Sequence, residues 1–320
     1  MPGSPSADVY DVEGFLALAA GSPDITLCAV LGRPVAHSLS PVIHAGAAQD
    51  AGTVPGFRYV RVEAGEEDEI RRLLSGSPAC VAGFSVTMPG KPHALTLADE
   101  VTDRAAAIGS ANTLVPLRDS DGAQTGRWLA DNTDVVGVTA CLDAVLGDTA
   151  PSRAAVVGNG GTARPTVAAF AAHGVHRVDV LARSDKALNL RALVESYGME
   201  FSWNRLDAPE LASVCAGCDV LVSTVPESAA GEYTDELSRA GAVVDVIYDP
   251  YPTHLLTEAV AAGRPVADGL LMLAGQGAEQ FRQFTGATAS AGAKYAALQK
   301  HHGLPGRCTW RRGGAKGLWG

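Results

Sequence analysis

A glycine-rich loop directly after a short apolar segment is the feature that most constrains the fold of this chain. Residues 154–157 read Ala-Ala-Val-Val, and such a continuous apolar run is typical of a strand buried on both faces of a parallel sheet. The loop consists of Gly158, Asn159, Gly160, Gly161 and Thr162, followed by the small Ala163. A helix is expected over 161–173, so backbone N–H groups at its start can hold a pyrophosphate that Gly160 lets approach. The arrangement predicts a dinucleotide-binding domain; a glycine turn without a ligand is the alternative.

The next expected strand is 177–181, and the residues that follow it indicate whether the dinucleotide is NAD or NADP. An acidic residue here would bind the ribose of NAD, whereas a basic one would accept the 2′-phosphate of NADP. The segment contains Ala182, Arg183, Ser184, Asp185 and Lys186. Arg183 can clamp a phosphate with charge-assisted hydrogen bonds, Ser184 can donate another, and Lys186 adds positive charge. The sequence therefore favours NADP; a solvated surface arginine is the alternative.

The chain is long enough for two domains, because 320 residues exceed the size at which a single core usually stops growing. In the first half, the pattern predicts strands over 27–31, 57–62 and 83–88, helices over 41–51, 66–74 and 95–107, and a hairpin over 111–117 and 126–129. In the second half it predicts four strands, over 154–157, 177–181, 220–223 and 242–247, and helices over 132–146, 161–173, 186–196, 270–284 and 291–301.

These elements predict an α/β fold of two domains with a cleft between them. A mixed α/β domain, expected to bind the substrate, takes residues 26–130 and 269–302. A Rossmann-type doubly wound domain takes residues 131–268. Residues 1–25, with a short helix over 12–20, are expected to form an N-terminal extension, and residues 303–320 a flexible tail.

Composition and charge argue against several classes of protein. A formal net charge of −10 would repel nucleic acids and anionic membranes at long range, so we expect neither as a partner. No apolar run reaches the length of a membrane span. Six scattered cysteines suit a reducing cytoplasm. Cys215 and Cys218 have the C-x-x-C spacing, but no histidine cluster lies near them in sequence, so we expect no metal.

A lysine at the end of an expected strand is a candidate catalytic residue. In Gly83–Lys91, Val86 and Met88 are expected to face inward, and Pro-Gly then turns the chain and presents Lys91 at the strand end. Open α/β folds bind ligands at this edge. Forty positions later, Asp131 begins the sequence Asp-Asn-Thr-Asp. Taken alone, the lysine is a solvated loop charge and the acid a turn or helix cap, so the pair matters only if other motifs converge on it.

Two serines before the first long helix form a candidate anion site. Ser40 is expected to be the N-cap, with Pro41 in the first helical position. In extended chain the hydroxyls of Ser38 and Ser40 point the same way, beside the positive end of the helix dipole. This arrangement suits a small carboxylate; a capped helix without a ligand is the alternative.

Together these segments resemble the shikimate dehydrogenase family. The matching segments are 32–41, 86–91, 109–114, 131–134, the glycine loop and 268–276, in the family's order and spread over about 27–300. The resemblance implies an NADP-dependent oxidoreductase that reversibly reduces 3-dehydroshikimate to shikimate, in chorismate and aromatic amino acid biosynthesis. It also implies a cytoplasmic monomer or homodimer without a metal.

The resemblance also assigns roles to individual residues. Lys91 and Asp131 would be catalytic, with Lys91 either donating a proton or stabilising a developing alkoxide. The residues implied to bind substrate are Ser38 and Ser40 at the carboxylate, and Thr87, Asn112, Tyr248 and Gln276 around the ring. Those implied to bind the cofactor are Gly158, Asn159, Gly160, Gly161, Thr162, Ala182, Arg183, Ser184, Lys186, Thr224, Val246 and Gly269.

Four positions depart from the family's usual pattern and leave alternatives open. Ala45, Ser85 and Ala182 stand where asparagine is common, and Val135 stands where glycine is frequent. Ala182 weakens the preference for NADP, and the first two leave room for an altered ring substituent. Quinate or aminoshikimate dehydrogenase is therefore an alternative within the family. A non-catalytic NADP-binding regulator and a methylenetetrahydrofolate dehydrogenase are alternatives outside it, although the latter leaves the serine pair and Asp131 unexplained.

Overall fold

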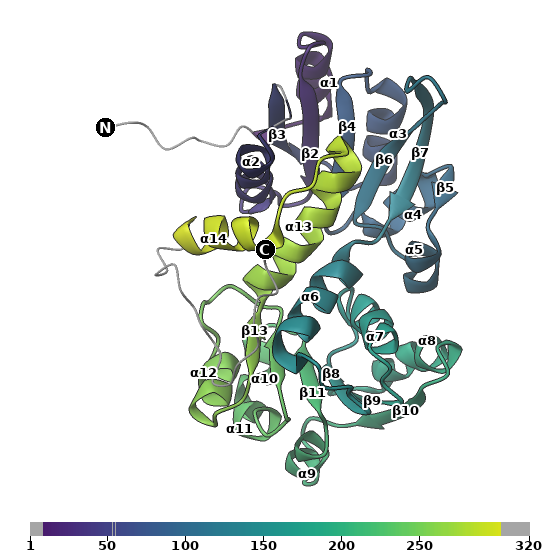
Figure 1. Cartoon of the computed structure of the whole chain (residues 1–320). Helices are drawn as coiled ribbons and strands as arrows, with labels where there is room; N and C mark the ends of the chain where they lie inside the picture. Colours follow the sequence, from purple (N-terminus) through teal and green to yellow (C-terminus); the bar gives the residue numbers. More distant parts are fainter. Residues whose placement is uncertain (1–8, 53, 55, 302–320) are drawn as a thin grey trace. The chain divides into compact units, whose positions relative to one another are not determined.

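The computed structural model describes residues 9–52, 54 and 56–301, and these form two compact units (Figure 1). The first unit contains the described residues up to Thr133 and those from Gly277 onward. The second unit is Asp134–Gln276. The predicted tail, 303–320, lies outside the described residues. Each unit has its own sheet and core and is described separately.

A mixed seven-stranded sheet forms the centre of the first unit. Its strands are β1 (Val9–Tyr10), β2 (Thr26–Gly32), β3 (Phe57–Glu63), β4 (Val81–Val86), β5 (Glu100–Val101), β6 (Thr113–Arg118) and β7 (Gln124–Asp131). They lie in the order β1-β3-β2-β4-β6-β7-β5. β6 is antiparallel to β4 and β7, and the other neighbours are parallel. The predicted strands and the hairpin are confirmed.

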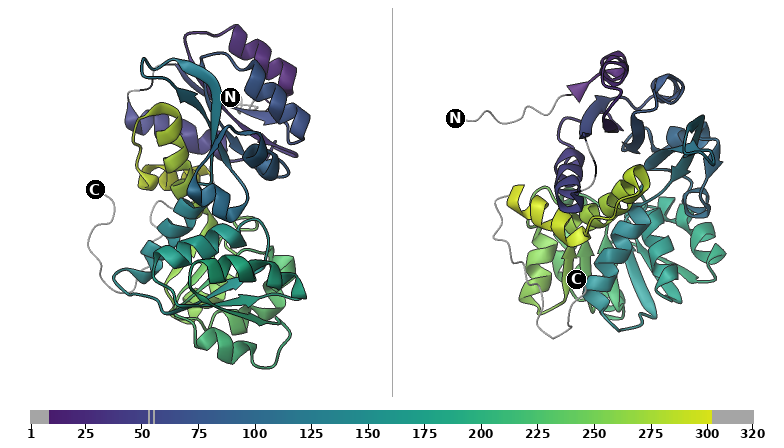
Figure 2. Two further views of the ribbon diagram at one scale, coloured as in Figure 1. Left: turned by 90° about the vertical axis from the view of Figure 1, so that its right-hand side faces the viewer. Right: turned by 45° about the horizontal axis from the view of Figure 1, so that its top comes forward.

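Helices cover both faces of this sheet (Figures 1 and 2). Helices α1 (Val12–Ala20), α3 (Glu67–Gly76) and α4 (Lys91–Leu97) pack on one face, around buried Phe15, Leu73 and Phe84. Helix α2 (Ser40–Ala51), the end of α13 (Gly269–Thr285) and α14 (Ala291–His301) pack on the other, around Phe281 and Ala47.

The residues expected to form an N-terminal extension contribute to this core. β1 pairs with β3 in parallel. The carboxylate of Asp11 caps α1 by accepting a hydrogen bond from Gly14 N at 2.7 Å. Phe15 and Ala19 of this helix are buried. The predicted helix over 12–20 is confirmed, and residues 9–25 fold as part of the first unit.

The predicted helix over 95–107 is wrong. The helix ends at Leu97, β5 follows, and α5 (Asp103–Ile108) starts afresh. The edge of β7 causes the break, because Asp99 N donates to Trp128 O at 2.9 Å and Asp99 Oδ2 accepts from Trp128 N at 2.8 Å. Thr102 then caps α5 by accepting from Ala105 N.

The second unit is doubly wound around a six-stranded parallel sheet. Its strands are β8 (Arg153–Val157), β9 (Arg177–Leu181), β10 (Glu200–Asn204), β11 (Val220–Ser223), β12 (Val243–Asp245) and β13 (Val266–Asp268). Their order, β10-β9-β8-β11-β12-β13, is that of a Rossmann fold. The prediction of four strands missed two. β10 is a half-buried strand with a polar Ser202 and Asn204, and β13 has only three residues, so neither gives a long apolar run.

Helices cover both faces of the second sheet as well (Figure 1). Helices α6 (Asp134–Leu146), α7 (Ala163–Ala172) and α8 (Arg191–Ser196) share one core cluster with the sheet. Helices α9 (Leu211–Ala216), α11 (Thr234–Leu237) and α12 (His254–Ala261) share another. The remaining short elements are η1 (Asp185–Leu190), α10 (Glu227–Ala230) and η2 (Gly231–Tyr233). The helix predicted over 186–196 is therefore a 3-10 helix followed by a short α-helix.

Among the described helices, none combines the length and the apolar character needed to cross a membrane.

Candidate active site

The glycine loop lies at the carboxyl end of β8, as the sequence predicted. Gly158 has a φ of +100°, and an added Cβ would collide with Val225. By contrast, an added Cβ at Gly160 or Gly161 would meet no atom within 4 Å. Ala163 is fully buried at the start of α7. The loop thus combines one position that requires glycine with an open stretch of backbone that a phosphate can approach.

The predicted phosphate-binding segment follows β9. Arg183, Ser184 and Lys186 are exposed, whereas Ala182 is buried. Within the part of the chain that the structure describes, neither Arg183 nor Lys186 forms an ion pair with an acidic side chain. Their charges are therefore available to an anionic ligand.

Three further cofactor candidates lie at the carboxyl ends of neighbouring strands. Thr224 Oγ1 donates to Val157 O at 2.7 Å, so it lies against the start of the glycine loop. Gly269 packs so closely on the carbonyl of Val246 that an added Cβ would collide with it. Because these strands are parallel, their carboxyl ends share the edge at which doubly wound folds bind nucleotides.

A buried acid that the sequence prediction missed holds the loop after β12. Asp245 accepts from Thr253 Oγ1 at 2.7 Å and from Ile247 N at 3.2 Å. Burial raises the pKa of Asp245 to about 6. This loop carries Tyr248, and burial raises the pKa of that phenol too. The only sequence signal for this role of Asp245 was its position as the last residue of an apolar strand.

In the first unit, the serine pair has a different geometry from the one predicted. Leu39, not Ser40, is the N-cap of α2, and its backbone is helical, with φ −84° and ψ −4°. The expected N-cap role of Ser40 is therefore wrong, and the segment is not extended. The two hydroxyls still converge, because Ser38 Oγ donates to Ser40 Oγ at 3.2 Å and accepts from Ser40 N at 3.3 Å.

The strand end that carries Thr87 is fixed by backbone bonds. Thr87 N donates to Leu31 O at 2.8 Å, and Gly90 N donates to Thr87 O at 2.9 Å. Lys91 is the first residue of α4, one turn beyond β4. Met88 was expected to face inward, but it is 74% exposed because β4 ends at Val86 and the alternation stops there.

Asn112 links this strand end to the segment that begins at Asp131. Asn112 O accepts from Val86 N at 2.7 Å, and Asn112 N donates to Asp131 O at 3.0 Å. Its side-chain oxygen accepts from Thr133 N at 2.8 Å. Next to it, Ala111 N donates to Lys91 O at 3.1 Å. The structure therefore brings Lys91, Asn112 and Asp131 into one hydrogen-bonded region.

The carboxylate of Asp131 is buried and saturated with hydrogen bonds. Its Oδ1 accepts from Thr102 Oγ1 at 2.7 Å, Arg104 Nε at 2.6 Å and Asn132 N at 2.7 Å. Its Oδ2 accepts from Gln283 Nε2 at 2.6 Å and from Arg104 Nη2. Burial alone would raise the pKa of Asp131, but the bonds from Arg104, Thr102 and Gln283 hold it below its ordinary value. Asp131 is therefore a fixed anion.

A second buried chain of hydrogen bonds was also missed from sequence. Tyr59 OH donates to Ser85 Oγ at 2.6 Å, and Ser85 Oγ donates to Gln280 Oε1 at 2.8 Å. Gln280 Nε2 then donates to Asn112 O and to Thr113 Oγ1, both at 3.0 Å. Ser85, which departs from the family pattern, is thus engaged with residues on β3 and α13.

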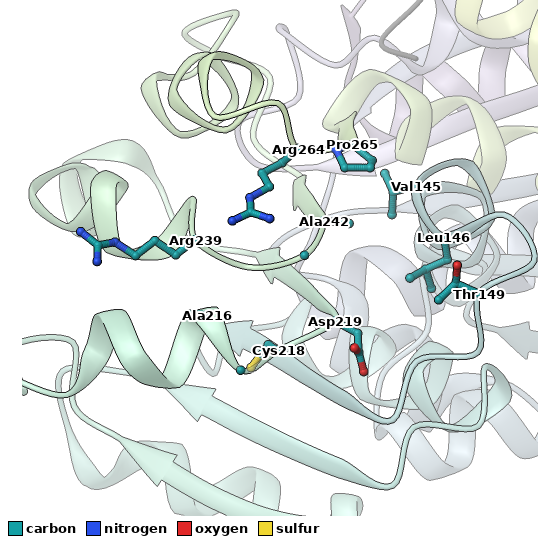
Figure 3. Close-up of a pocket in the computed structure, with 12 residues that line it drawn as sticks. Val145, Leu146, Thr149, Ala216, Cys218, Asp219, Arg239, Ala242, Arg264 and Pro265 are labelled. Carbon is teal, nitrogen blue, oxygen red and sulfur yellow. The ribbon is translucent and has the colours of Figure 1, made fainter. Parts of the chain in front are cut away.

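A cavity of the second unit contains none of the predicted site residues (Figure 3). It has a volume of about 420 Å³ and is lined by Asp219, Ala242 and Pro265, which immediately precede β11, β12 and β13. It therefore lies at the amino ends of the strands, opposite the glycine loop. Cys218 lines it, and burial raises the pKa of this thiol and of Cys215 to about 12. Neither thiol is a reactive thiolate.

The fold and these residues define a class: a two-unit α/β dehydrogenase with a Rossmann unit. Family models match residues 30–114 as the shikimate dehydrogenase substrate binding domain and residues 269–299 as the shikimate 5′-dehydrogenase C-terminal domain. Shikimate dehydrogenase (NADP(+)) of Citrifermentans bemidjiense is 36% identical over 288 residues, covering 87% of this chain and 96% of the relative. The chain belongs to the shikimate dehydrogenase family.

Solved structures agree with this assignment. The shikimate 5-dehydrogenase of Mycobacterium fortuitum has a TM-score of 0.77 and 42% identity, covering 86% of this chain and 98% of that one. The shikimate 5-dehydrogenase of Thermus thermophilus, solved in complex with NADP(H) and shikimate, has a TM-score of 0.72 and 31% identity, covering 86% of this chain and 99% of that one. The predicted fold class and family are confirmed.

Proposed function

We propose that this protein catalyses the reversible NADPH-dependent reduction of 3-dehydroshikimate to shikimate. Membership of the family supports the reaction, which belongs to chorismate and aromatic amino acid biosynthesis. The observation that carries the proposal is the hydrogen-bonded region joining Lys91, Asn112 and Asp131 at the ends of β4 and β7. A non-catalytic binding protein would not need the backbone of a lysine to be tied to a segment that carries a buried carboxylate with a lowered pKa.

The binding roles are those that the family resemblance implies. Ser38 and Ser40 bind the substrate carboxylate through their converging hydroxyls. Thr87 and Asn112 contact the ring substituents, and the family resemblance gives Tyr248 and Gln276 the same role. Backbone hydrogen bonds at strand ends position Thr87 and Asn112. Tyr248 lies on the loop after β12, and Gln276 lies on α13.

The second unit supplies the cofactor site. The open backbone of Gly158–Thr162 receives the pyrophosphate, and Arg183, Ser184 and Lys186 receive the 2′-phosphate. Ala182 lines the adenosine side. Thr224, Val246 and Gly269 would hold the nicotinamide side.

When bound, the nicotinamide would supply the hydride that reduces C3 of the substrate. In the direction of reduction, Lys91 Nζ gives a proton to the C3 oxygen, and in the reverse direction it takes the proton back. Asp131 does not accept this proton, because its carboxylate already accepts five hydrogen bonds and its pKa is lowered. Instead, its fixed negative charge contributes to the electrostatic field of the site.

The test is to follow the absorbance of reduced nicotinamide with NADP or NAD against shikimate, quinate and aminoshikimate. We expect the highest kcat/KM for shikimate with NADP. A higher value for quinate or aminoshikimate would assign the chain to the corresponding alternative, in line with Ser85 and Ala45. Absence of turnover on all three substrates would overturn the proposal and favour a regulator.

We also propose that the enzyme works in the cytoplasm, because the five cysteines within the described residues are free thiols.

The family resemblance leaves the oligomeric state open between monomer and homodimer. Sedimentation velocity would decide between the two.

A further inference from the structure

A buried arginine of the first unit lies beside the serine pair without a carboxylate partner. Arg61, on β3, is 7% exposed. Its Nε and Nη2 donate to the carbonyl oxygen of Ser38 at 3.1 Å and 2.6 Å. Among the described residues no acidic side chain forms an ion pair with it. Tyr59 is the titratable group that interacts with it, and burial raises the pKa of that phenol, so Tyr59 is neutral near pH 7.

The position of Arg61 on the sheet explains its contact with the serines. Side chains alternate along β3, so Tyr59 and Arg61 share the face covered by α2. Arg61 pairs with Val30 of the central strand β2, which keeps it inside the sheet. Arg58 lies on the opposite face, where its guanidinium donates to Tyr10 OH at 2.9 Å. One strand thus offers a functional candidate and a matched control.

Burying a guanidinium that has only a neutral partner lowers the stability of the fold unless an anion binds nearby. Removing a charge from water is unfavourable, and a single carbonyl offsets only part of that loss. Here burial lowers the pKa of Arg61, which is the sign of an incompletely compensated cation. The N-terminus of the twelve-residue helix α2, which begins at Ser40, adds positive potential, and the two serine hydroxyls are neutral hydrogen-bonding groups beside it. This combination of groups favours the binding of an anion.

We propose that Arg61 is a positioning residue for the substrate's carboxylate. By gripping the Ser38 carbonyl with two hydrogen bonds, it fixes the turn that makes the hydroxyls of Ser38 and Ser40 converge. Its uncompensated charge attracts the carboxylate that those hydroxyls bind. Arg61 acts through Ser38 and does not touch the reacting carbon. The inference rests on the proposed function and adds a charge requirement to it.

The proposal predicts a selective loss of affinity. Arg61→Met should raise the Kd of shikimate about 10- to 100-fold, the range for a charge-assisted interaction. The Kd of shikimate methyl ester, which has no carboxylate charge, should change by less than about threefold, since only a neutral hydrogen bond is affected. Arg61→Lys keeps the charge but loses the pair of hydrogen bonds to Ser38 O. Its Kd for shikimate should therefore lie between those of wild type and Arg61→Met. Turnover at saturating shikimate should stay within about threefold, because the reacting atoms are untouched.

The experiment measures both Kd values by isothermal titration calorimetry for wild type, Arg61→Met, Arg61→Lys and the control Arg58→Met. Circular dichroism selects the folded variants, and Arg61→Lys carries the test if Arg61→Met does not fold. The expected result is that the preference for acid over ester falls in the Arg61 variants and is retained in Arg58→Met.

An equal loss of affinity for shikimate and for its methyl ester would show that Arg61 has only a structural role. An unchanged preference for the acid over the ester would show that the charge of Arg61 does not contribute to recognition. Either result overturns the inference while the proposed function stands. If wild type does not bind shikimate at all, the proposed function fails as well.

Discussion

The two units hold their site residues in different ways. In the second unit, the cofactor candidates are open backbone, as at Gly160, or exposed side chains, as at Arg183. In the first unit, Asp131 is bound by residues from α5 and α13, and Arg61 grips the Ser38 carbonyl. The cofactor side is built from local segments, whereas the substrate side is built from side chains that orient one another.

This difference predicts how each side responds to substitution. A change in the cofactor segment should alter one contact and leave its neighbours in place. A change in the substrate network should leave a buried group unsatisfied and so affect several neighbours at once. The variants below test this contrast.

The largest effect is expected at Lys91. Lys91→Met should lower kcat about 10²- to 10⁴-fold with little change in the KM of NADP, because a positioned proton donor contributes on that scale. Steady-state kinetics on folded protein would check this. Lys186→Met, in the cofactor segment, is the control and should weaken NADP without a comparable loss of kcat. Near-normal kcat in Lys91→Met would remove the lysine from the chemistry.

The next effect concerns the buried carboxylate of Asp131. In Arg104→Met, burial is no longer opposed by the guanidinium, so the pKa of Asp131 should rise. The pH at which kcat falls on the acidic side should therefore move upward. The control is Arg282→Met, which removes an exposed arginine paired with Glu279. A pH profile that is identical in wild type and Arg104→Met would contradict the fixed-anion role.

A smaller and more local effect is expected in the second unit. Arg183→Ala should raise the KM of NADP about 10- to 100-fold and leave that of NAD nearly unchanged, since only NADP carries the 2′-phosphate. Arg191→Ala, which removes a guanidinium stacked on Phe201, is the matched control. Equal effects of Arg183→Ala on both cofactors would exclude the phosphate contact.

The smallest effect on activity, and a distinct one on stability, is expected at Lys294. Its Nζ is buried, donates to Gly277 O at 3.1 Å and lies 4.8 Å from the centre of the Phe281 ring. Burial lowers its pKa to about 7 from an ordinary 10.5. Between these values the unfolded chain binds the proton and the folded one does not, so stability rises with pH and is lowest below pH 7.

Urea unfolding at pH 7 and pH 9 would measure this dependence. The contribution of Lys294 corresponds to about 2 kcal/mol of added stability at pH 9 relative to pH 7. Lys294→Met should lack it, whereas Lys300→Met, on the same helix, should retain it. The same pH dependence in wild type and Lys294→Met would show that other groups cause it.

The sequence located the candidate segments of the second unit, but it missed the hydrogen-bond network of the first. The glycine loop and the segment after β9 are contiguous, so turn and strand rules were sufficient to find them. Gln283, Gln280 and Arg104 were missed because they reach Asp131 or Ser85 from distant parts of the chain, and no local pattern marks them.

Most elements were predicted, and the errors have physical causes. The helix over 95–107 failed because pairing with β7 overrides its apolar pattern. The N-cap expected at Ser40 failed because Leu39 already has helical torsions. The roles of individual site residues, which came from family resemblance, remain predictions for the variants above.

The most direct test of the division between the two units is a double-mutant cycle on kinetic constants. Ser38→Ala with Ser40→Ala should raise the KM of shikimate at least about tenfold and leave that of NADP unchanged, and Arg183→Ala should do the reverse. Each loss in kcat/KM can be expressed as a free energy. In the combined variant, the free energies of the two single changes should add within about 0.5 kcal/mol. A serine variant that weakens NADP as strongly as shikimate, or a coupling above about 1 kcal/mol, would contradict the account.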